Sequence, residues 1–272
     1  MSKASKIDRP LLFIVLGLVT IGFIIFLSAS LGLTARSTTQ YSAVVTNQIL
    51  LGLILGGIAA FVVSKINYQV WRKWSFWLFL AALLSSLLVF IPGIGFESGG
   101  ASRWIHLGPL SFQPSEFLKI TFVLYMAMWF STVKSKVKTI KYGLLPFLGF
   151  SGVVSAIILA QRDTDTLVVM LTSATAMYIV AGAKWKHILI LILIGVIGLS
   201  GLVMARPYVK DRFMTFLNPA ADPLNSGYQI QQSLIAVGSG GFFGRGFGQS
   251  LQKFNFLPEP IGDSIFAVAA EE

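Results

Sequence analysis

The chain has 272 residues, of which 55% are hydrophobic and 12% charged, and it carries a formal net charge of +10. Soluble domains carry about 25% charged residues, so this composition excludes an ordinary soluble domain. The absence of cysteine excludes disulfides and thiol chemistry. The basic residues are scattered between apolar runs rather than gathered into one patch, which argues against a nucleic-acid partner.

Seven apolar runs follow one another along the chain, and each approaches the roughly 17–25 residues with which a helix crosses a bilayer. They are residues 11–33, 49–63, 74–94, 117–133, 142–160, 166–183 and 188–205. The first is too long for a cleavable signal peptide, and the second needs a turn from residues 41–48. An eighth run starts at Ser264 and stops at Glu271, so we interpret the chain as a fragment. The pattern predicts one all-α, polytopic membrane bundle over residues 1–272, with seven transmembrane helices plus the start of an eighth.

Basic residues mark one set of connections between these runs and indicate the orientation in the membrane. With the N-terminus inside, the inner segments hold Lys3, Lys6, Arg9, Lys65, Arg72, Lys73, Lys134, Lys136, Lys138, Lys141, Lys184 and Lys186. The short outer connections hold Arg36, Arg103 and Arg162. The positive-inside rule therefore predicts a cytoplasmic N-terminus. Residues 206–263 are then a long extracytoplasmic loop.

The outer connection before the fourth run ends in a helix start. Pro114 and Ser115 suit the first positions of a helix, which puts Glu116 in the first turn and Lys119 three residues later on the same face. Ionisable residues in a span usually face a cavity or a partner. We expect the pair to point into the bundle near the outer surface. It is either a structural salt bridge or part of a site.

Two further outer groups suggest specific roles, and the first of them allows two interpretations. Arg103 beside Trp104 is either an interfacial anchor, which the spacing favours, or a ligand for phosphate. Asp163 or Asp165 suits the N-cap of the sixth helix. His106 and His187 are isolated, and the chain shows no spacing of zinc ligands, so we predict no protein-encoded metal site.

The long loop is rich in glycine, amides and hydroxyls, in segments 225–233, 238–250 and 257–263. Glycine permits close backbone approach to a ligand, and glutamine and serine bind hydroxyls and phosphates without net charge. Residues 244–248 are not preceded by a strand, so we reject a nucleotide fingerprint. Asp263 lies where this loop meets the eighth run. It is either a helix N-cap or a general base, made more effective by partial desolvation at the membrane boundary.

Together these motifs resemble the SEDS family (shape, elongation, division and sporulation), which includes FtsW and RodA, membrane glycosyltransferases that polymerise peptidoglycan from lipid II. The matching blocks are residues 100–105, 113–119, 161–163, 228–248, 257–259, 263–268 and 271–272. Residues 248–253 are more similar to the FtsW branch than to the RodA branch, which favours a role in cell division. The resemblance runs from the first span to the last residue.

The resemblance implies that Asp263 is catalytic and takes the proton of an acceptor sugar. The expected substrate-binding residues are Arg103, Glu116, Lys119, Gln232, Ser233, Ser239, Gly240, Gly241 and Lys253. A divalent cation (Mg or Mn), or Arg103, Lys119 and Arg245, would offset the charge of the leaving diphosphate. The implied partners are lipid II, the undecaprenyl-diphosphate-linked glycan, a class B penicillin-binding transpeptidase and division-complex membrane proteins. The implied location is the bacterial cytoplasmic (inner) membrane.

Two positions depart from the family pattern, and two other functions remain open. Ile261 and Gly262 stand where the family usually has His-Thr, and Ser264 where it has Phe; residues 161–166 depart from its Gln-Pro-Asp-x-Gly-Thr. A lipid II flippase would need ionisable residues deep in the spans, whereas the charges here collect at the outer surface. A non-catalytic division scaffold is the second alternative, although it does not require Asp263.

Overall fold

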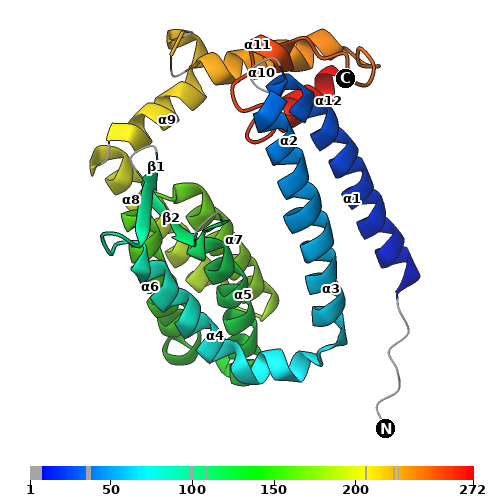
Figure 1. The fold of residues 1–272 in the computed structure, drawn as a ribbon. Coiled ribbons are helices and arrows are strands. Elements are labelled where there is room, and N and C mark those ends of the chain that lie inside the picture. Colours follow the sequence, from blue (N-terminus) through cyan, green and yellow to red (C-terminus); the bar gives the residue numbers. More distant parts are fainter. Residues whose placement is uncertain are drawn as a thin grey trace. The chain divides into compact units, whose positions relative to one another are not determined.

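Two compact units make up the chain in the computed structural model, one formed by Met1–Val63 with Ser200–Glu272 (unit 1) and one by Ser64–Leu199 (unit 2). Each unit is described by itself below, with the element labels of Figure 1. The structure describes residues 8–34, 38–98, 101–107, 110–205, 207–222, 224–225 and 227–272.

Unit 2 is a bundle of antiparallel helices, in which a long connection separates α4 from α5 and the later connections are short. Its elements are α4 (Tyr68–Leu88), α5 (Pro114–Val133), η3 (Lys134–Lys138), η4 (Ile140–Leu144), α6 (Leu145–Ala160), α7 (Thr164–Val180) and most of α8 (Trp185–Ala205). Helix α5 packs against α4 and α7, and α6 packs against α4 and α7. The predicted helix start at Pro114 is confirmed.

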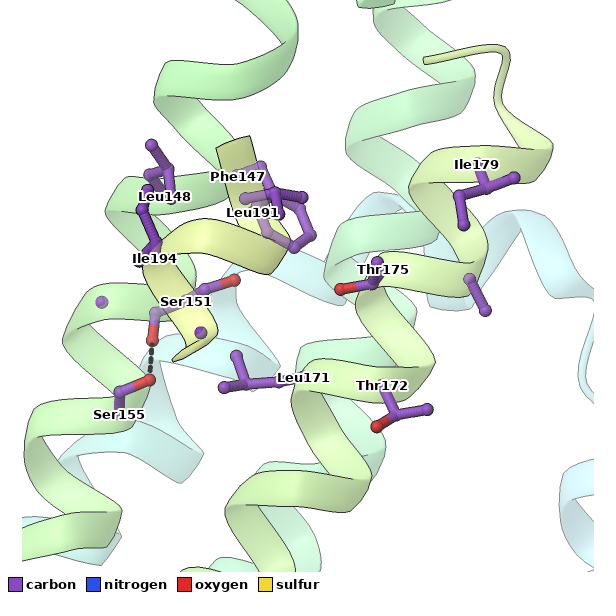
Figure 2. Close-up of a pocket in the computed structure, with 13 residues that line it drawn as sticks. Phe147, Leu148, Ser151, Ser155, Leu171, Thr172, Thr175, Ile179, Leu191 and Ile194 are labelled. Carbon is purple, nitrogen blue, oxygen red and sulfur yellow. Dashed lines mark hydrogen bonds between the residues drawn. The ribbon is translucent and has the colours of Figure 1, made fainter. Parts of the chain in front are cut away.

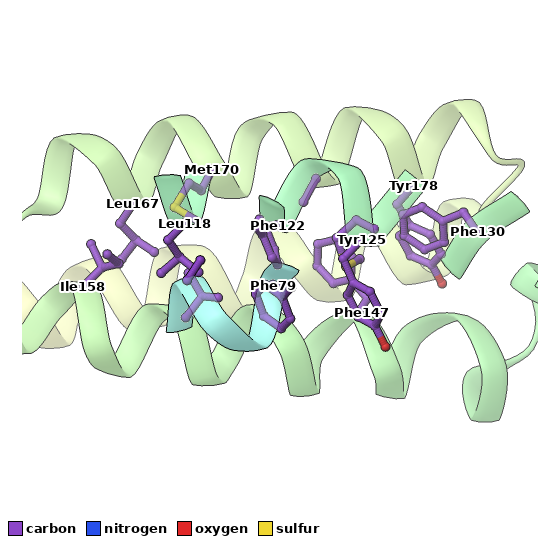
Figure 3. Close-up of a cluster of buried hydrophobic side chains, with 14 of the residues drawn as sticks. Phe79, Leu118, Phe122, Tyr125, Phe130, Phe147, Ile158, Leu167, Met170 and Tyr178 are labelled. Carbon is purple, nitrogen blue, oxygen red and sulfur yellow. The ribbon is translucent and has the colours of Figure 1, made fainter. Parts of the chain in front are cut away.

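Aromatic side chains fill the core of unit 2 (Figure 3). Phe79 of α4 stacks on Tyr125 of α5, with ring centroids 5.2 Å apart. Phe130 and Tyr178 stack at the same separation near the other end of the core. The Tyr178 hydroxyl lies 2.7 Å from Nδ1 of the buried His187, so this histidine is a core residue. Close packing of this kind holds membrane helices together, because lipid tails are as apolar as the side chains themselves.

A small antiparallel sheet lies in the connection between α4 and α5, where we predicted no strand. It consists of β1 (Gly95–Ser98), β2 (Ala101–Leu107) and β3 (Leu110–Phe112) in the order β1-β2-β3. Ile105 is paired with Gly95 on one side and Phe112 on the other. Its side chain is buried. The all-α expectation is therefore wrong at this connection, because the three short strands satisfy one another's backbone groups.

Unit 1 combines the N-terminal helices with residues Ser200–Glu272 at the C-terminal end of the chain. Its elements are α1 (Arg9–Ser30), η1 (Leu31–Leu33), α2 (Thr38–Asn47), η2 (Gln48–Leu55), most of α3 (Gly56–Lys65), α9 (Pro207–Leu217), η5 (Pro219–Ala221), α10 (Tyr228–Gly240), α11 (Gln252–Asn255) and α12 (Ile265–Glu271). Helix α12 packs against α1 and α10, and α11 packs against η1. Figure 1 shows α10, α11 and α12 gathered at the C-terminal end of α1.

The stretch predicted as a long loop, residues 206–263, contains the helices α9, α10 and α11. Glycine content suggested irregular structure, because glycine disfavours helices by about 1 kcal/mol. Tertiary packing overrides this preference, since Ala236 of α10 is fully buried against α12 and Leu257. The buried residues at this junction are mostly small, so the backbones approach closely.

Apolar helices of bilayer length confirm the membrane class but not the count of seven. Among the residues that the structure describes, five helical stretches are long and apolar enough to cross a membrane, namely Arg9–Leu33, Tyr41–Lys65, Pro114–Lys138, Ile140–Ala160 and Trp185–Ala205. A shorter apolar helix, Thr164–Val180, matches the sixth predicted run. Helix α4 covers the third run but includes Arg72 and Lys73. The chain is thus a polytopic helical membrane protein.

Candidate active site

Asp263 lies in the turn that leads into α12, and its side chain is exposed. The N-cap of α12 is Ser264, the next residue, and no side chain caps the helix. The interpretation of Asp263 as an N-cap is therefore wrong. Within the described parts of the chain, no hydrogen bond or ion pair reaches the Asp263 carboxylate. An unbonded, accessible carboxylate can accept a proton from a bound hydroxyl.

The turn that presents Asp263 is fixed by its backbone. The amides of Gly262 and Ser264 both donate to the carbonyl of Glu259, at 3.1 and 3.2 Å. Glu259 has φ +43°, a conformation that non-glycine residues rarely adopt. The side chain of Ser264 is buried, and its Oγ accepts from Nε2 of Gln229 at 3.3 Å. Asp263 is thus an exposed residue on a rigid turn.

The predicted saccharide-binding residues of α10 fall into two groups. Gln232 and Ser233 are half-buried. Ser239 instead donates to Oε1 of Glu271 at 3.2 Å, and Gly240 is buried against α12. A Cβ at Gly240 would lie 2.1 Å from the carbonyl oxygen of Ala270. Ser239 and Gly240 therefore pack α10 against α12, while Gln232 and Ser233 are accessible to a ligand.

Gly241 ends α10 with φ +57°, and the segment after it folds around the end of α12. The amide of Arg245 donates to the Glu271 carbonyl at 2.9 Å, and the Arg245 Nε lies 3.7 Å from Glu271 Oε1. The Arg245 side chain is 38% exposed. Its guanidinium is therefore anchored on one side and can reach an anion on the other.

Lys253 does not have the accessibility that substrate binding requires. Its side chain is fully buried, and its Nζ lies 2.5 Å from Glu272 Oε1 and 2.9 Å from Ser28 Oγ. The prediction that Lys253 contacts substrate is wrong for this structure, because the ammonium group is already enclosed by a carboxylate and a hydroxyl. A buried, paired charge of this kind is a structural group.

Glu271 is a residue that our sequence interpretation did not assign to the site. Its side chain is fully buried, and four groups donate to it: Ser250 Oγ at 2.5 Å, Ser239 Oγ and the Leu251 amide at 3.2 Å, and the Gln252 amide at 3.4 Å. The signal that could have found it is a carboxylate at the end of an apolar run, where an unpaired charge is costly.

In unit 2, Arg103 of β2 belongs to a network around Asp163. Its Nη1 lies 3.9 Å from Asp163 Oδ1, and its Nε donates to the Gln161 carbonyl at 3.4 Å. Nη2 of the same Arg103 guanidinium donates to the Arg162 carbonyl. Arg103 therefore ties β2 to the turn between α6 and α7, a contact that neither the anchor nor the phosphate-ligand interpretation predicted. Its side chain is 26% exposed.

Asp163 occupies the N-cap position of α7, as predicted, but its side chain does not cap the helix. Its Oδ2 instead accepts from Ser115 Oγ and Gln113 Nε2, both at 3.2 Å. The carboxylate is almost completely buried. Gln161 reaches the Ser86 carbonyl with its Nε2 at 2.8 Å. These bonds join α4, α5 and α7 at one end of unit 2.

Glu116 and Lys119 form the predicted ion pair on one face of α5, with 2.9 Å between Oε1 and Nζ. Their side chains are 56% and 31% exposed. Within unit 2 the pair does not point into the bundle, so that part of the prediction is wrong for this unit. Both groups are accessible to a ligand.

A cavity of about 600 Å³ lies between α6, α7 and α8 (Figure 2). Leu148, Leu171 and Ile194 give it an apolar lining, and Ser151 adds a buried hydroxyl without a hydrogen-bond partner in the described structure. None of the predicted site residues lines this cavity. We therefore place the candidate chemistry at the Asp263 turn, where an accessible carboxylate is present. The described residues contain no group of three or more His, Asp or Glu side chains able to hold a metal.

The fold and this site define a polytopic helical membrane protein with an exposed carboxylate on a hydrogen-bonded turn beside the start of α12. Residues 9–272 match the family of cell cycle proteins that comprises FtsW, RodA and SpoVE, and the chain belongs to this family. It is 41% identical over 271 residues to stage V sporulation protein E of Bacillus subtilis, covering 100% of this chain and 74% of that protein. It is 38% identical to the probable peptidoglycan glycosyltransferase FtsW of a Geobacter species, and the match again covers 100% of this chain and 74% of that protein.

Solved structures agree with this assignment. One, titled as the structural coordination of polymerization and crosslinking by a peptidoglycan synthase complex, is 28% identical with a TM-score of 0.67, covering 94% of this chain and 70% of that one. A variant of the rod shape determining protein RodA from Thermus thermophilus is 27% identical with a TM-score of 0.56, covering 74% of this chain and 60% of that one.

Proposed function

We propose that this protein is a peptidoglycan glycosyltransferase that polymerises lipid II into glycan strands at the outer face of the cytoplasmic membrane during cell division. The observation that carries the proposal is the exposed carboxylate of Asp263, which has no bonding partner among the described residues and lies on a fixed turn. Relatives named as probable peptidoglycan glycosyltransferases support the reaction class.

The chemistry needs one proton acceptor and one stabilised leaving group. The oxygen of an acceptor sugar hydroxyl attacks the anomeric carbon of a lipid-linked sugar and forms the new glycosidic bond. The bond from that carbon to the diphosphate breaks, and its electron pair leaves with the diphosphate. The Asp263 carboxylate takes the proton of the attacking hydroxyl. The step needs no further reactant, because the diphosphate takes the electron pair and Asp263 takes the proton.

Positive charge near the diphosphate stabilises the leaving group. In unit 1, Arg245 suits this role because its guanidinium is partly exposed while its backbone is tied to Glu271. The roles that the resemblance implies for Arg103 and Lys119 of unit 2 stay predictions, and both side chains are partly exposed. Gln232 and Ser233 are candidates for contacts with the saccharide. A divalent cation would depend on the diphosphate for ligands, so we derive no step through it.

We propose that the catalytic partner is a class B penicillin-binding transpeptidase, together with division-complex membrane proteins. The support is the similarity to a structure whose title names both polymerization and crosslinking in one complex. Such a pairing is chemically coherent, because a transpeptidase crosslinks the strands that the polymerase makes.

The orientation, with the N-terminus cytoplasmic and residues 206–263 outside, is a proposal from the positive-inside rule. Because the chain has no cysteine, single cysteines at Ser226 and Ser135 can be labelled from outside intact cells. Ser226 lies outside the described residues. We expect labelling at Ser226→Cys alone. Labelling at Ser135→Cys alone would reverse the orientation.

One reconstitution separates the three candidate functions. Purified protein in liposomes is given lipid II, and both glycan polymer and movement of lipid II between leaflets are measured. We expect polymer. Movement without polymer would favour the flippase, and neither activity, with binding of division proteins retained, would favour the scaffold.

A further inference from the structure

The side chains of two consecutive glutamates at the end of α12, Glu271 and Glu272, are buried, and both accept a hydrogen bond from Ser250. Their other partners differ. Glu271 accepts hydrogen bonds from the segment that follows α10 and from the start of α11. Glu272 faces Ser28 of α1 and Lys253 of α11. The side chains of Lys253 and Glu272 are 0% and 8% exposed. A buried charge is costly unless it is paired, so the two are held together.

The Ser28 hydroxyl completes this ion pair. It accepts from Lys253 Nζ at 2.9 Å and lies 2.7 and 2.6 Å from the two carboxylate oxygens of Glu272. Ser28 is itself buried, near the C-terminal end of α1. These groups, from α1, α11 and the residue that follows α12, thus form one cluster, which we call the Ser28 triad (Ser28, Lys253 and Glu272).

Backbone packing makes the triad specific to these positions. A Cβ at Gly32 would lie 2.3 Å from the carbonyl oxygen of Lys253, so only glycine lets α11 approach the end of α1 this closely. A Cβ at Gly244 would lie 2.0 Å from the Glu272 carbonyl oxygen. Both ends of the ion pair are therefore held against neighbouring backbone.

The triad links the two ends of the segment that contains Asp263, the candidate base. Lys253 and Glu272 are 19 residues apart in sequence, and Asp263 lies near the middle of the segment between them. This segment contains the turn at Glu259 and Ser264 that presents the carboxylate. Fixing both ends of a short segment restricts the positions that its middle can adopt.

We propose that Ser28, Lys253 and Glu272 are positioning residues that hold the Asp263 turn in its reactive place by tying α11 and α12 to α1. The inference rests on the proposed function in taking Asp263 as the base. The tie itself is a property of the structure and can be measured without any activity.

The decisive variant removes the tie without leaving a lone charge in the interior. Lys253→Met combined with Glu272→Gln replaces a buried ion pair by neutral groups of similar size, which proteins often tolerate. Each single variant leaves one buried charge unpaired, so we expect the singles to lose folded yield. Lys210→Met, on an exposed position of α9, removes one positive charge from the same unit and serves as control.

The protein is reconstituted in lipid nanodiscs, and melting temperature, hydrogen exchange of residues 257–264, and kcat and KM for lipid II polymerisation are measured. For the double variant we expect a melting temperature close to the wild type and exchange in this segment at least about tenfold faster. We expect kcat to fall by about 10- to 100-fold with KM little changed, because misplacing a catalytic group by about 1 Å can have effects of this size. The Lys210→Met control should match the wild type.

A folded double variant with wild-type exchange in residues 257–264, or with wild-type kcat despite faster exchange, overturns the inference. If the double variant does not fold, Ser28→Ala keeps the ion pair and removes the bridging hydroxyl. For this variant we expect faster exchange in residues 257–264 and a lower kcat, each by a few-fold. No change in either quantity would overturn the inference. If the wild-type protein makes no polymer, the proposed function fails, and the exchange measurement alone decides whether the triad holds the turn.

Discussion

Asp163 in unit 2 and Asp263 in unit 1 each precede a helix, but they differ in burial and in hydrogen-bond partners. Asp163 is 4% exposed as a side chain and is bound by Ser115, Gln113 and Arg103. Asp263 is exposed, and the described structure gives its carboxylate no partner. One carboxylate has its hydrogen-bonding capacity used inside the fold, and the other has it available for a ligand.

The comparison extends to the groups around each aspartate. In unit 2 the buried polar atoms meet directly at Asp163, so the carboxylate itself is the structural centre. In unit 1 it is Glu271 and Glu272 that bind the surrounding segments and hold them together, while the side chain of Asp263 stays exposed. Separating the holding groups from the reacting group lets the reacting group keep an open hydrogen-bonding site on a rigid support.

Asp263→Asn gives the sharpest test of this difference. The amide keeps the shape but cannot act as a base, so lipid II polymerisation should fall by about 10²- to 10⁴-fold. The melting temperature should stay near the wild type, because no bond within the described structure is lost. Polymer yield from purified lipid II and thermal unfolding measure the two effects. Near-normal polymerisation would end the assignment of Asp263 as base.

Asp163→Ala should have the opposite profile. It removes the acceptor for Ser115 and Gln113 and the counter-charge of Arg103, and bonds to a charged group contribute roughly 1.5–3 kcal/mol. We expect the free energy of unfolding to fall by about that amount. Unfolding in detergent measures the change, and any loss of activity per folded molecule should be smaller than for Asp263→Asn. An unchanged stability would contradict the structural role.

Two glycines of α10 should respond with opposite signs. Gly240→Ala places a Cβ against the Ala270 carbonyl, and overpacking of this kind typically costs about 1–3 kcal/mol. Gly238→Ala meets nothing within 4 Å, so the better helix propensity of alanine should stabilise by up to about 1 kcal/mol. Melting temperatures of the two variants measure the contrast. Equal shifts would show that α10 does not pack against α12 through Gly240.

Glu116→Ala should have the smallest effect on folding. An exposed pair at i,i+3 contributes about 0.2–0.5 kcal/mol, so the free energy of unfolding should hardly change. A clear loss of polymerisation at unchanged stability would add Glu116 and Lys119 to the substrate-binding residues. Small losses of similar size in polymerisation and in stability would show that the pair is only a surface salt bridge of α5.

The sequence by itself determined the membrane class, the positions of most helices and the family. Composition and run length suffice for this, because a bilayer demands long apolar helices whatever their packing. The ion pair of Glu116 and Lys119 also followed from spacing alone, since i,i+3 neighbours share a helix face. The order of motifs then located Asp263 at the edge of the glycine-rich stretch.

Only the tertiary structure decided which polar residues are accessible. Lys253 and Gln232 look equally suited to bind a substrate in sequence, yet the first is enclosed by Glu272 and Ser28 and the second is half-buried at the surface of α10. Arg103, Ser239 and Gly240 likewise proved to bind other parts of their own unit. The physical reason is that burial and pairing depend on residues far apart in the chain, and Ser28 and Glu272 are separated by 244 positions.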